Sequence, residues 1–595
     1  MALWNNQKKD SVGPDWPPEV VLTFLALAVA MILVVTVMPL AVAWVTTGHS
    51  GHLTGSQMWH AIMGGLRAKA FPAAFRWRLP HGADYWLMAA LIAAVPVSFV
   101  VAAGHRIRIV MSMPVTDKRW WSLRGRSPRE FARWGTIARL TVRRPSPGRH
   151  IVGRYQGALV ACEPMVHIAL IAPTGAGKTS AEIVPFLLEH RGPALNVSTK
   201  TDVIRDTIKL RQQLGSVYVW DPFGATQPTD PWEPSKFTPL NGCETFHGAL
   251  QVAKDLDRAR VGGADTGQSS TERFFGDRTQ DLTGPLMWAA RVGGYSIVDV
   301  LNWVRNFAAT PIGQQAGQPP APPDAPLKVL TDIRTADAQD AIDRLLAVHR
   351  TEPRQRDSIV GTAMVQLACY GNPLAATSAT GKGEYITPEA LIAGPGRNTL
   401  YIVASREQQE LLAPIVVLIV ASVQRHAAEL EQRTGEPLTP PLLMALDETG
   451  TAAPLKDLPA QTSVGRSAGV QYVTSWQTLA QLYRVYGEYG GAEILTNSAC
   501  KLVLGPIEDD KTRAYVVGAL GRHQMVDGEH AIHNTRDVAT AQALRTARPT
   551  DALLLHSGYP AAPLKQRRAH EDRLLRRLKE GQLERDKSSS RVWGR

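Results

Sequence analysis

The chain has 595 residues, a formal net charge of +12 at pH 7 and four cysteines. This length is enough for several domains with a large core, and the basic balance favours a polyanionic partner over a basic protein. The cysteines stand singly along the sequence, which does not fit the paired spacing of a zinc site or a disulfide framework and favours small buried thiols in a reducing compartment: Cys162, Cys243, Cys369 and Cys500.

Two long apolar stretches without charges lie near the N-terminus, at residues 20–45 and 83–104. Each is long enough to cross about 30 Å of hydrocarbon as a helix. Arginines crowd together from Arg106 onward, and such a cluster belongs on the cytoplasmic side. We therefore expect two transmembrane helices, with residues 1–19 in the cytoplasm and residues 46–82 forming an external loop.

A basic membrane-proximal segment, residues 105–164, follows the second apolar stretch. It contains short strand-like pieces at residues 136–142, 150–156 and 158–162. Its arginines allow two interpretations that the sequence leaves open. They could be attracted to anionic lipid headgroups, or they could line a path for nucleic acid at the membrane.

Residues 166–191 have the order of strand, glycine-bearing turn and helix that a phosphate-binding loop requires. Gly175 and Gly177 can take backbone angles that let successive N–H groups converge on a polyphosphate at a helix N-terminus. Lys178 would reach the β- and γ-phosphates, and the Thr179 hydroxyl would ligate Mg²⁺. The residues predicted to bind ATP in this Walker A segment are Pro173, Thr174, Gly175, Ala176, Gly177, Lys178, Thr179 and Ser180.

Apolar runs alternate with helical stretches after the loop, which predicts a parallel-rich α/β sheet with helices on both faces. Residues 242–350 show helical patterns and little strand signal, so we expect an all-α insertion there, interrupted by a flexible Pro/Gly/Gln stretch at residues 313–326. The nucleotide-binding domain then comprises residues 165–241 and 351–564. The remainder, residues 565–595, is predicted to be a basic, disordered tail.

An apolar run at residues 442–446 ends in two acids, as the second half of a P-loop site (Walker B) requires. Asp447 would hold Mg²⁺ directly or through water, and Glu448 would orient and deprotonate the attacking water. An apolar run before Asp-Glu is common by chance. Its pairing with the phosphate-binding loop makes the interpretation specific.

Two further residues are candidates for catalysis. Gln477 follows the predicted strand 470–474, where an adjacent parallel strand would deliver a sensor of the γ-phosphate; the alternative is an ordinary exposed glutamine. Arg466 lies in the connection before that strand, where it could project across a subunit boundary as an arginine finger; the alternative is a surface arginine.

Taken together, these residues resemble the VirD4/TraG/TraD family of coupling proteins of type IV secretion and conjugation, which are membrane-anchored, hexameric, FtsK-like ATPases. The resemblance extends from about residue 153 to residue 564. It rests on A-P-T-G-A-G-K-T, W-D-P-F-G with F-T-P-L-N, F-F-G-D-R-T-Q-D-L, L-D-E-T-G, G-R-S-A-G-V and S-W-Q-T-L-A-Q-L-Y.

The resemblance implies a RecA/FtsK-like P-loop NTPase domain with an inserted all-α domain, preceded by two transmembrane helices in the inner (cytoplasmic) membrane. It implies ATP and Mg²⁺ as ligands, cargo recruitment by the helical domain, and delivery of a relaxase-bound DNA strand to a secretion channel. Two positions depart from the family pattern: Ala172 replaces the first glycine of the loop, and Ser198 replaces an acid in S-T-K-T-D. The residues that match the family's catalytic positions are Lys178, Thr179, Asp447, Glu448, Arg466 and Gln477.

Three functions remain open at this point. The leading one is a hexameric ATPase that translocates DNA. A motor for protein substrates only is the second, because the sequence lacks an aromatic and basic platform on which single-stranded bases would stack. The third is a cargo receptor that binds nucleotide without turnover.

Overall fold

The computed structural model describes residues 134–226, 230–257, 270–307, 324–392, 397–405, 407–451, 455, 457–525, 534–537 and 539–582. These residues all belong to one compact unit, Leu123–Arg595. The two predicted transmembrane stretches, 20–45 and 83–104, lie outside the described residues.

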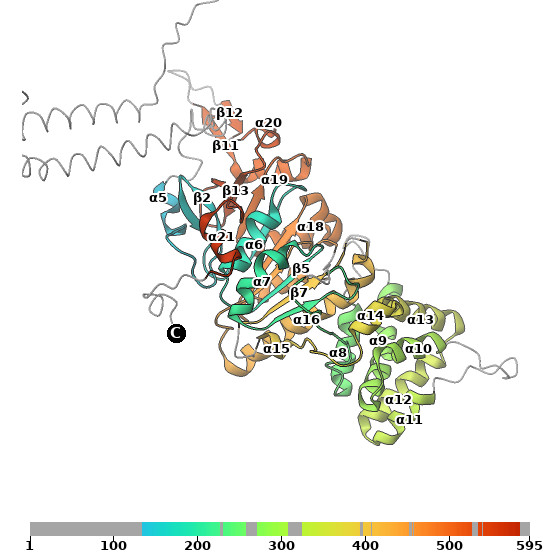
Figure 1. The fold of residues 1–595 in the computed structure, drawn as a ribbon. Coiled ribbons are helices and arrows are strands. Elements are labelled where there is room, and N and C mark those ends of the chain that lie inside the picture. Colours follow the sequence, from blue (N-terminus) through green and yellow to red (C-terminus); the bar gives the residue numbers. More distant parts are fainter. Residues whose placement is uncertain are drawn as a thin grey trace, which may run out of the picture. The chain divides into compact units, whose positions relative to one another are not determined.

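A mixed sheet of twelve strands lies at the centre of the described part (Figure 1). The strands from β10 to β6 run parallel, and those from β13 to β1 are antiparallel. In spatial order they are β1 (Thr141–Val142), β3 (Ala158–Ala161), β2 (Ile151–Tyr155), β14 (Ala562–Lys565), β13 (Asp551–His556), β10 (Cys500–Leu504), β4 (Ile168–Ile171), β9 (Val470–Trp476), β8 (Leu442–Leu446), β5 (Ala194–Ser198), β7 (Thr399–Val403) and β6 (Val217–Trp220).

The parallel strands are almost continuously apolar because helices cover both of their faces. Strands β4 and β8, for example, have every residue buried. The register places Ile171 opposite Trp476 and Leu446 opposite Thr474. The carboxyl ends of β4, β9 and β8 therefore lie together along the side of the sheet where the parallel strands end. This arrangement confirms the parallel-rich α/β fold expected from the sequence.

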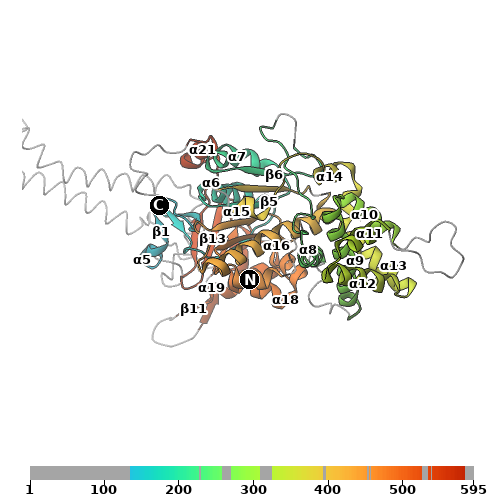
Figure 2. The same ribbon diagram turned by 90° about the horizontal axis from the view of Figure 1, so that it is seen from below.

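Helices pack against both faces of the sheet. Figure 2 shows α6 (Val184–Glu189), α7 (Asp202–Leu214) and α21 (Arg573–Lys579) on one face, with α16 (Gln409–Thr434), α18 (Leu479–Asn497) and α19 (Asp510–Leu520) on the other. Helix η3 (Lys178–Ile183) leads into α6, α17 (Leu458–Val464) lies between β8 and β9 in the chain, and α20 (Ala541–Arg545) precedes β13.

Among the described residues, α16 is the one helix long and apolar enough to cross a membrane, and 78% of its most apolar window is buried inside the protein. Its residues from Leu412 to Val420 pack into the core. Burial within the domain accounts for the apolar composition of α16, so this helix carries no argument for a membrane span.

A cluster of helices connects β6 to β7, as the sequence predicted (Figure 1). Helix α13 packs against α9 and α10, so we extend the helical insertion beyond residue 350, to the end of α14. The helices are α8 (Phe246–Asp257), α9 (Ser270–Gly293), α10 (Ile297–Asn306), α11 (Asp324–Ile333), α12 (Ala336–His349), α13 (Pro353–Leu367), η4 (Ala368–Gly371), α14 (Pro373–Ser378) and, beside α16, α15 (Pro388–Ile392).

The segment before β2 differs from the expectation. Residues 136–142 were predicted to be a strand, but α5 (Trp134–Ile137) and η2 (Ala138–Leu140) occupy most of them, and only β1 joins the sheet. Ile137 and Leu140 are buried three residues apart, a spacing that suits one face of a helix and would place the two side chains on opposite faces of a strand. A separate hairpin, β11 (Arg522–Met525) with β12 (Asn534–Asp537), lies outside the main sheet.

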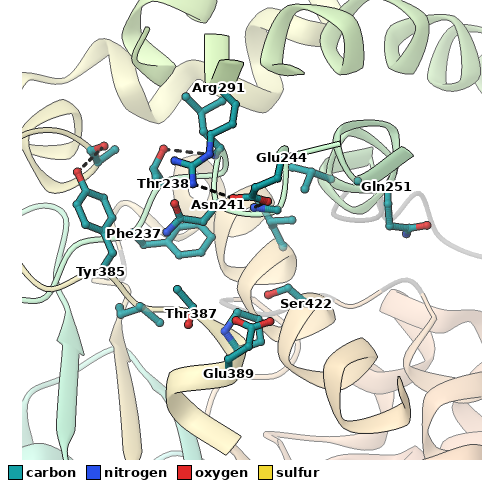
Figure 3. Close-up of a pocket in the computed structure, with 18 of the residues that line it drawn as sticks. Phe237, Thr238, Asn241, Glu244, Gln251, Arg291, Tyr385, Thr387, Glu389 and Ser422 are labelled. Atoms are coloured by element: carbon teal, nitrogen blue, oxygen red, sulfur yellow. Dashed lines mark hydrogen bonds and ion pairs between the residues drawn. The ribbon is translucent and has the colours of Figure 1, made fainter. Parts of the chain in front are cut away.

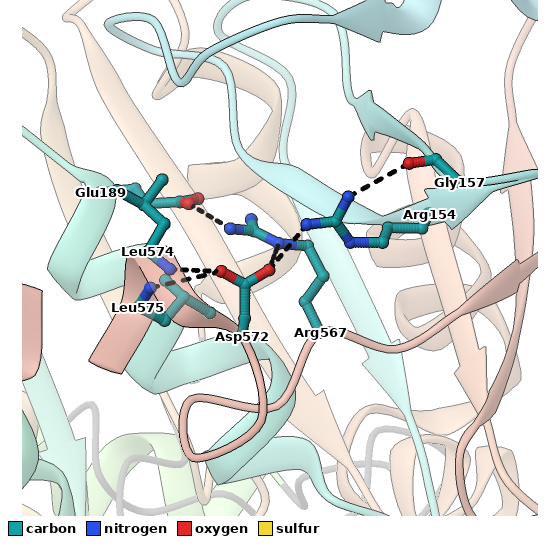
Figure 4. Close-up of polar contacts among 7 residues, drawn as sticks. All are labelled: Arg154, Gly157, Glu189, Arg567, Asp572, Leu574 and Leu575. Atoms are coloured by element: carbon teal, nitrogen blue, oxygen red, sulfur yellow. Dashed lines mark hydrogen bonds and ion pairs between the residues drawn. The ribbon is translucent and has the colours of Figure 1, made fainter. Parts of the chain in front are cut away.

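The C-terminal segment also differs from the expectation, because residues 565–582 are folded against the sheet domain. Asp572 accepts hydrogen bonds from the backbone N–H groups of Leu574 and Leu575, so it caps α21. Arg567 pairs with Glu189 at 2.8 Å and with Asp572 at 3.2 Å (Figure 4). The sequence shows a charged stretch that is typical of disorder, whereas the structure buries its charges in pairs. Residues 583–595 lie outside the described residues.

Replacing Arg567 should destabilise this segment strongly. Its side chain is 2% exposed, and those of Glu189 and Asp572 are 4% and 8% exposed. Removing Arg567 leaves the buried carboxylate of Glu189 without its partner, which costs about 3–5 kcal/mol, whereas Asp572 keeps its pair with Arg154 at 2.8 Å. We expect Arg567→Met to lower the free energy of unfolding by this amount in urea titrations.

Lys209→Gln serves as the control, because the Lys209–Glu580 pair joins the same segment to α7 with both side chains more than half exposed. Exposed pairs contribute less than about 1 kcal/mol.

Burial alone would raise the pKa of Asp572, but Arg154 and Arg567 lower it to about 2. An unfolded aspartate titrates near ~3.9, so the part of the penalty that comes from Asp572 should be complete above pH 4 and shrink as the pH falls towards 2. Burial raises the pKa of Glu189, so as the pH falls the part that comes from Glu189 should be lost at a higher pH than the part from Asp572. A loss no larger than that of Lys209→Gln would contradict the buried network.

Candidate nucleotide-binding site

The phosphate-binding loop lies between β4 and η3, at the carboxyl edge of the parallel strands. Gly175 and Gly177 have φ values of +82° and +93°, a region that favours glycine. A Cβ on Gly177 would also meet Gln566 Oε1 at 3.0 Å. Ala172 does not have a positive φ, so the methyl group that replaces the first glycine of the motif introduces no backbone strain.

The two halves of the predicted site meet at one hydrogen bond. The Thr179 hydroxyl donates to Asp447 Oδ2 at 2.9 Å, across 268 residues of sequence. This contact forms because β9 separates β4 from β8 by one strand, which brings the residues after both strands to the same edge. Glu448 is partly exposed beside Asp447, so it can reach a ligand that enters from solvent.

The charges of this site influence one another. Burial lowers the pKa of the Lys178 ammonium, and the carboxylates of Glu448 and Asp447 oppose that shift. Burial raises the pKa of Asp447 to about 6, against the hydrogen bonds from Thr179 and Ser198 and the charge of Lys178. The Lys178 ammonium therefore lies near the carboxylates of Asp447 and Glu448. A divalent cation would balance the charge of the carboxylates, and the phosphates of a nucleotide would pair with the ammonium and the cation.

Two buried oxygens at this edge lack a hydrogen-bond partner among the described residues: Asp447 Oδ1 and Ser475 Oγ. Buried polar atoms are normally paired, so unpaired ones beside a phosphate-binding loop mark a place where a ligand belongs. A carboxylate, a hydroxyl and phosphate oxygens suit Mg²⁺, which prefers oxygen ligands and keeps several waters. The residues present therefore fit a Mg²⁺ ion held by Asp447 and Thr179.

Ser198 and Ser475 are site residues that sequence reasoning did not select. Ser198 ends β5 beside β8 and hydrogen-bonds to Asp447. The backbone N–H of Ser475 donates to Thr449 Oγ1 at 3.1 Å. Both stand at the carboxyl ends of predicted strands, a property that they share with many residues outside the site. Ser198 carried one further signal, because it takes the place of an acid in the family pattern.

Gln477 lies next to the start of the phosphate-binding loop. The carbonyl of Trp476 accepts a hydrogen bond from the Ala172 N–H at 2.9 Å, which ties the end of β9 to the residue after β4. The backbone N–H of Gln477 donates to Gln481 Oε1 at 2.8 Å, and its side chain is partly exposed. This position is compatible with the predicted role as a sensor of the γ-phosphate.

Arg466 is exposed and lies away from these residues. It precedes β9, and the seven residues of β9 span roughly 20 Å before Trp476 at the edge with the loop. Its charge acts instead on His167, which stands before β4. Within one chain Arg466 therefore lies near the amino ends of the parallel strands, and the fold does not bring it to the other predicted site residues.

A cavity of about 960 Å³ lies elsewhere, between the helical insertion and the sheet domain. Figure 3 shows Phe237 and Asn241 on the segment after β6, Arg291 on α9 and Ser422 on α16 lining it. Arg291 pairs with Glu244 at 2.9 Å across its mouth. The candidate nucleotide residues do not line this cavity, which is therefore a separate feature of the molecule.

Comparisons with known proteins agree with this fold. Residues 131–545 match the family described as type IV secretory system conjugative DNA transfer. The protein VirD4 of Agrobacterium fabrum is 22% identical over 467 residues, a match that covers 74% of this chain and 64% of VirD4.

Solved structures show the same fold. The bacterial conjugative coupling protein TrwBdeltaN70 in complex with sulphate aligns with a TM-score of 0.53 and 17% identity, over 74% of this chain and 96% of TrwBdeltaN70. Plasmid coupling protein TrwB in complex with ADP and Mg²⁺ aligns with a TM-score of 0.52 and 17% identity, over 74% of this chain and 93% of that protein. The family match covers most of the chain, and the chain belongs to the type IV secretory system conjugative DNA transfer family, as a coupling protein of the VirD4/TraG type with a P-loop NTPase fold.

Proposed function

We propose that this protein is a membrane-anchored ATPase that couples ATP hydrolysis to the translocation of DNA through a type IV secretion channel. The observation that carries the proposal is the hydrogen bond between Thr179 and Asp447. It joins the phosphate-binding loop to the acidic strand end, so the two residues predicted to hold Mg²⁺ lie side by side. The binding of ADP and Mg²⁺ by TrwB, a protein of the same fold, supports the same ligands here.

Each side chain has a distinct role in this proposal. The amides of the loop and the Lys178 ammonium bind the β- and γ-phosphates. Thr179 and Asp447 would hold Mg²⁺, which would supply positive charge against the charge that develops on the phosphates. Glu448 accepts a proton from the water that attacks the γ-phosphorus as the bond to the β-phosphate oxygen breaks, and Gln477 orients that water.

The proposal includes a homo-hexameric ring. Arg466 lies on the wrong edge of the sheet to serve its own site, and head-to-tail contacts in a closed ring would present it to the next subunit. Such a ring would be anchored in the cytoplasmic membrane by residues 20–45 and 83–104, with the ATPase domain in the cytoplasm.

DNA is the proposed substrate, carried with a relaxase or another secreted cargo protein that the helical insertion recruits. The family description names conjugative DNA transfer, and the net charge of +12 suits a polyanion. Because contacts to phosphate release counterions, DNA affinity should fall by orders of magnitude between about 50 and 200 mM salt.

The ATPase rate of the full chain in detergent, with and without single-stranded and duplex DNA, tests this function. We expect DNA to stimulate hydrolysis at low salt and the stimulation to disappear at high salt. Stimulation by cargo protein alone would replace the proposal with a protein-only secretion motor. Nucleotide binding without hydrolysis under every stimulus would replace it with a cargo receptor.

A further inference from the structure

The C-terminal segment brings a buried glutamine against the phosphate-binding loop. Gln566 is 5% exposed. Its Nε2 donates to the carbonyl of Ala176 at 3.1 Å and to the carbonyl of Asp551 at 3.2 Å. This side chain therefore ties the centre of the loop to the start of β13, and the carbonyl that it holds lies between the two glycines whose amides would face phosphate.

The other end of the same carboxamide is unused. Gln566 Oε1 is buried and has no hydrogen-bond partner among the described residues, and it lies 3.0 Å from where a Cβ on Gly177 would stand. A methyl group at residue 177 would therefore press directly on the glutamine. The close approach of Gly177 to Gln566 adds to its positive φ as a reason for glycine at this position.

An arginine reaches the same point from two residues further on. Arg568 Nε lies 3.8 Å from the position of a Cβ on Gly177, and it too is buried without a hydrogen-bond partner among the described residues. One terminal nitrogen of its guanidinium donates to the carbonyl of Pro549 at 3.2 Å, near the surface. Most of the donors of this guanidinium are thus available beside a loop that would hold phosphate.

The backbone of the segment is fixed in this place. The Ala569 N–H donates to the carbonyl of Ser180 at 2.9 Å. Arg567 pairs with Glu189 at the far end of the loop's helix (Figure 4). The segment therefore follows the phosphate-binding loop and its helix from Ala176 to Glu189, and Arg568 cannot move far from Gly177 without breaking these contacts.

A buried guanidinium N–H without a partner destabilises a folded protein unless a ligand with an acceptor satisfies it. An arginine is suited to phosphate, because its guanidinium keeps its charge and donates several parallel hydrogen bonds. The position of Arg568 Nε beside Gly177 indicates a nucleotide phosphate as that ligand.

We propose that residues 566–569 form a wall of the nucleotide site, in which Arg568 donates to a phosphate of the bound nucleotide as a second cation beside Lys178. Gln566 is the positioning residue that holds the loop through the carbonyl of Ala176. Both act in their own subunit, in contrast to Arg466. This inference rests on the proposed function, because it assigns further residues to the same site.

Nucleotide titrations of the full chain in detergent test the role of Arg568. Arg568→Gln should bind ATP and ADP about 10- to 100-fold more weakly, because it loses a charge-assisted contact to phosphate. Arg568→Lys keeps the positive charge but lacks the planar guanidinium with its parallel donors, and it should recover part of that affinity. Arg573→Gln is the matched control, since Arg573 is an exposed arginine of the same segment, and it should bind nucleotide as the wild type does.

Steady-state kinetics test the role of Gln566. Gln566→Leu keeps the volume of the side chain but loses the hydrogen bond to Ala176, so KM for ATP should rise several-fold while kcat changes less. A fall in melting temperature with KM unchanged would show that Gln566 is structural only and would overturn its assignment.

The outcomes separate this inference from the proposed function. Suppose that Lys178→Ala loses nucleotide binding while Arg568→Gln and Arg568→Lys both bind nucleotide within twofold of the wild type. The assignment of residues 566–569 to the nucleotide site is then wrong, and the proposed site around Lys178 is retained. If Lys178→Ala also binds and hydrolyses ATP normally, the proposed site itself is wrong, and the inference falls with it.

Discussion

Lys178→Ala should reduce ATP hydrolysis by the full chain to background. Lys178 is the ammonium that faces Asp447 and Glu448 in the loop, and no other lysine of the phosphate-binding loop could replace it. Its loss removes the charge that would stabilise the β- and γ-phosphates during transfer. The measurement is phosphate release at saturating ATP and Mg²⁺.

Glu448→Gln separates binding from chemistry at the same site. The amide cannot accept the proton of the attacking water, which should lower kcat by about 10²- to 10⁴-fold, while ATP stays bound. Lys328→Ala, at an exposed lysine on α11, is the control and should leave turnover unchanged. Normal hydrolysis by Lys178→Ala would exclude this loop as the catalytic site.

Arg466→Ala should lower kcat by about 10³- to 10⁵-fold, the contribution of an arginine finger in phosphoryl transfer. Nucleotide affinity should stay close to that of the wild type, because Arg466 lies at the opposite edge of the sheet from the loop in its own chain. Arg484→Ala, at an exposed arginine on α18, provides the comparison and should retain full activity.

Mixing two inactive variants tests whether Arg466 acts between subunits. Lys178→Ala subunits carry the arginine but lack the loop lysine, and Arg466→Ala subunits carry the lysine but lack the arginine. Mixed rings contain boundaries at which both residues are present, so activity should return in proportion to those boundaries. If mixtures remain inactive although the subunits assemble together, the proposal that Arg466 acts across a boundary is wrong.

The sequence predicted the parts of the fold that depend on local pattern. The order of strand, glycine turn and helix around Lys178 specifies the loop, and buried parallel strands such as β8 are visible as short apolar runs. The cluster of helices between β6 and β7 was visible as helical periodicity without strand signal. In each case neighbouring residues carry the information.

In the antiparallel half, β2 and β3 were visible as strand-like pieces at residues 150–156 and 158–162, but the pairing that joins them to the sheet was not. Strand β14 pairs with β2 through Lys565 and Arg154, so its partner lies more than 400 positions earlier in the chain. A separation of 390 residues likewise hid the contact of Gln566 with Ala176. The prediction of disorder from composition was wrong for the segment that begins at residue 565. Its charged residues are typical of disorder, but Arg567 and Asp572 are buried as an ion pair.

By itself, the sequence determined the chemistry available to this protein: a lysine and a threonine on a glycine turn, and two acids at the end of an apolar strand. The tertiary structure decided which of these groups meet. Strand order brings Thr179 to Asp447, leaves Arg466 at the far edge, and folds residues 566–569 against the loop. Strand order and long-range contacts are set by packing the whole core at once, and no local spacing of residues encodes that packing.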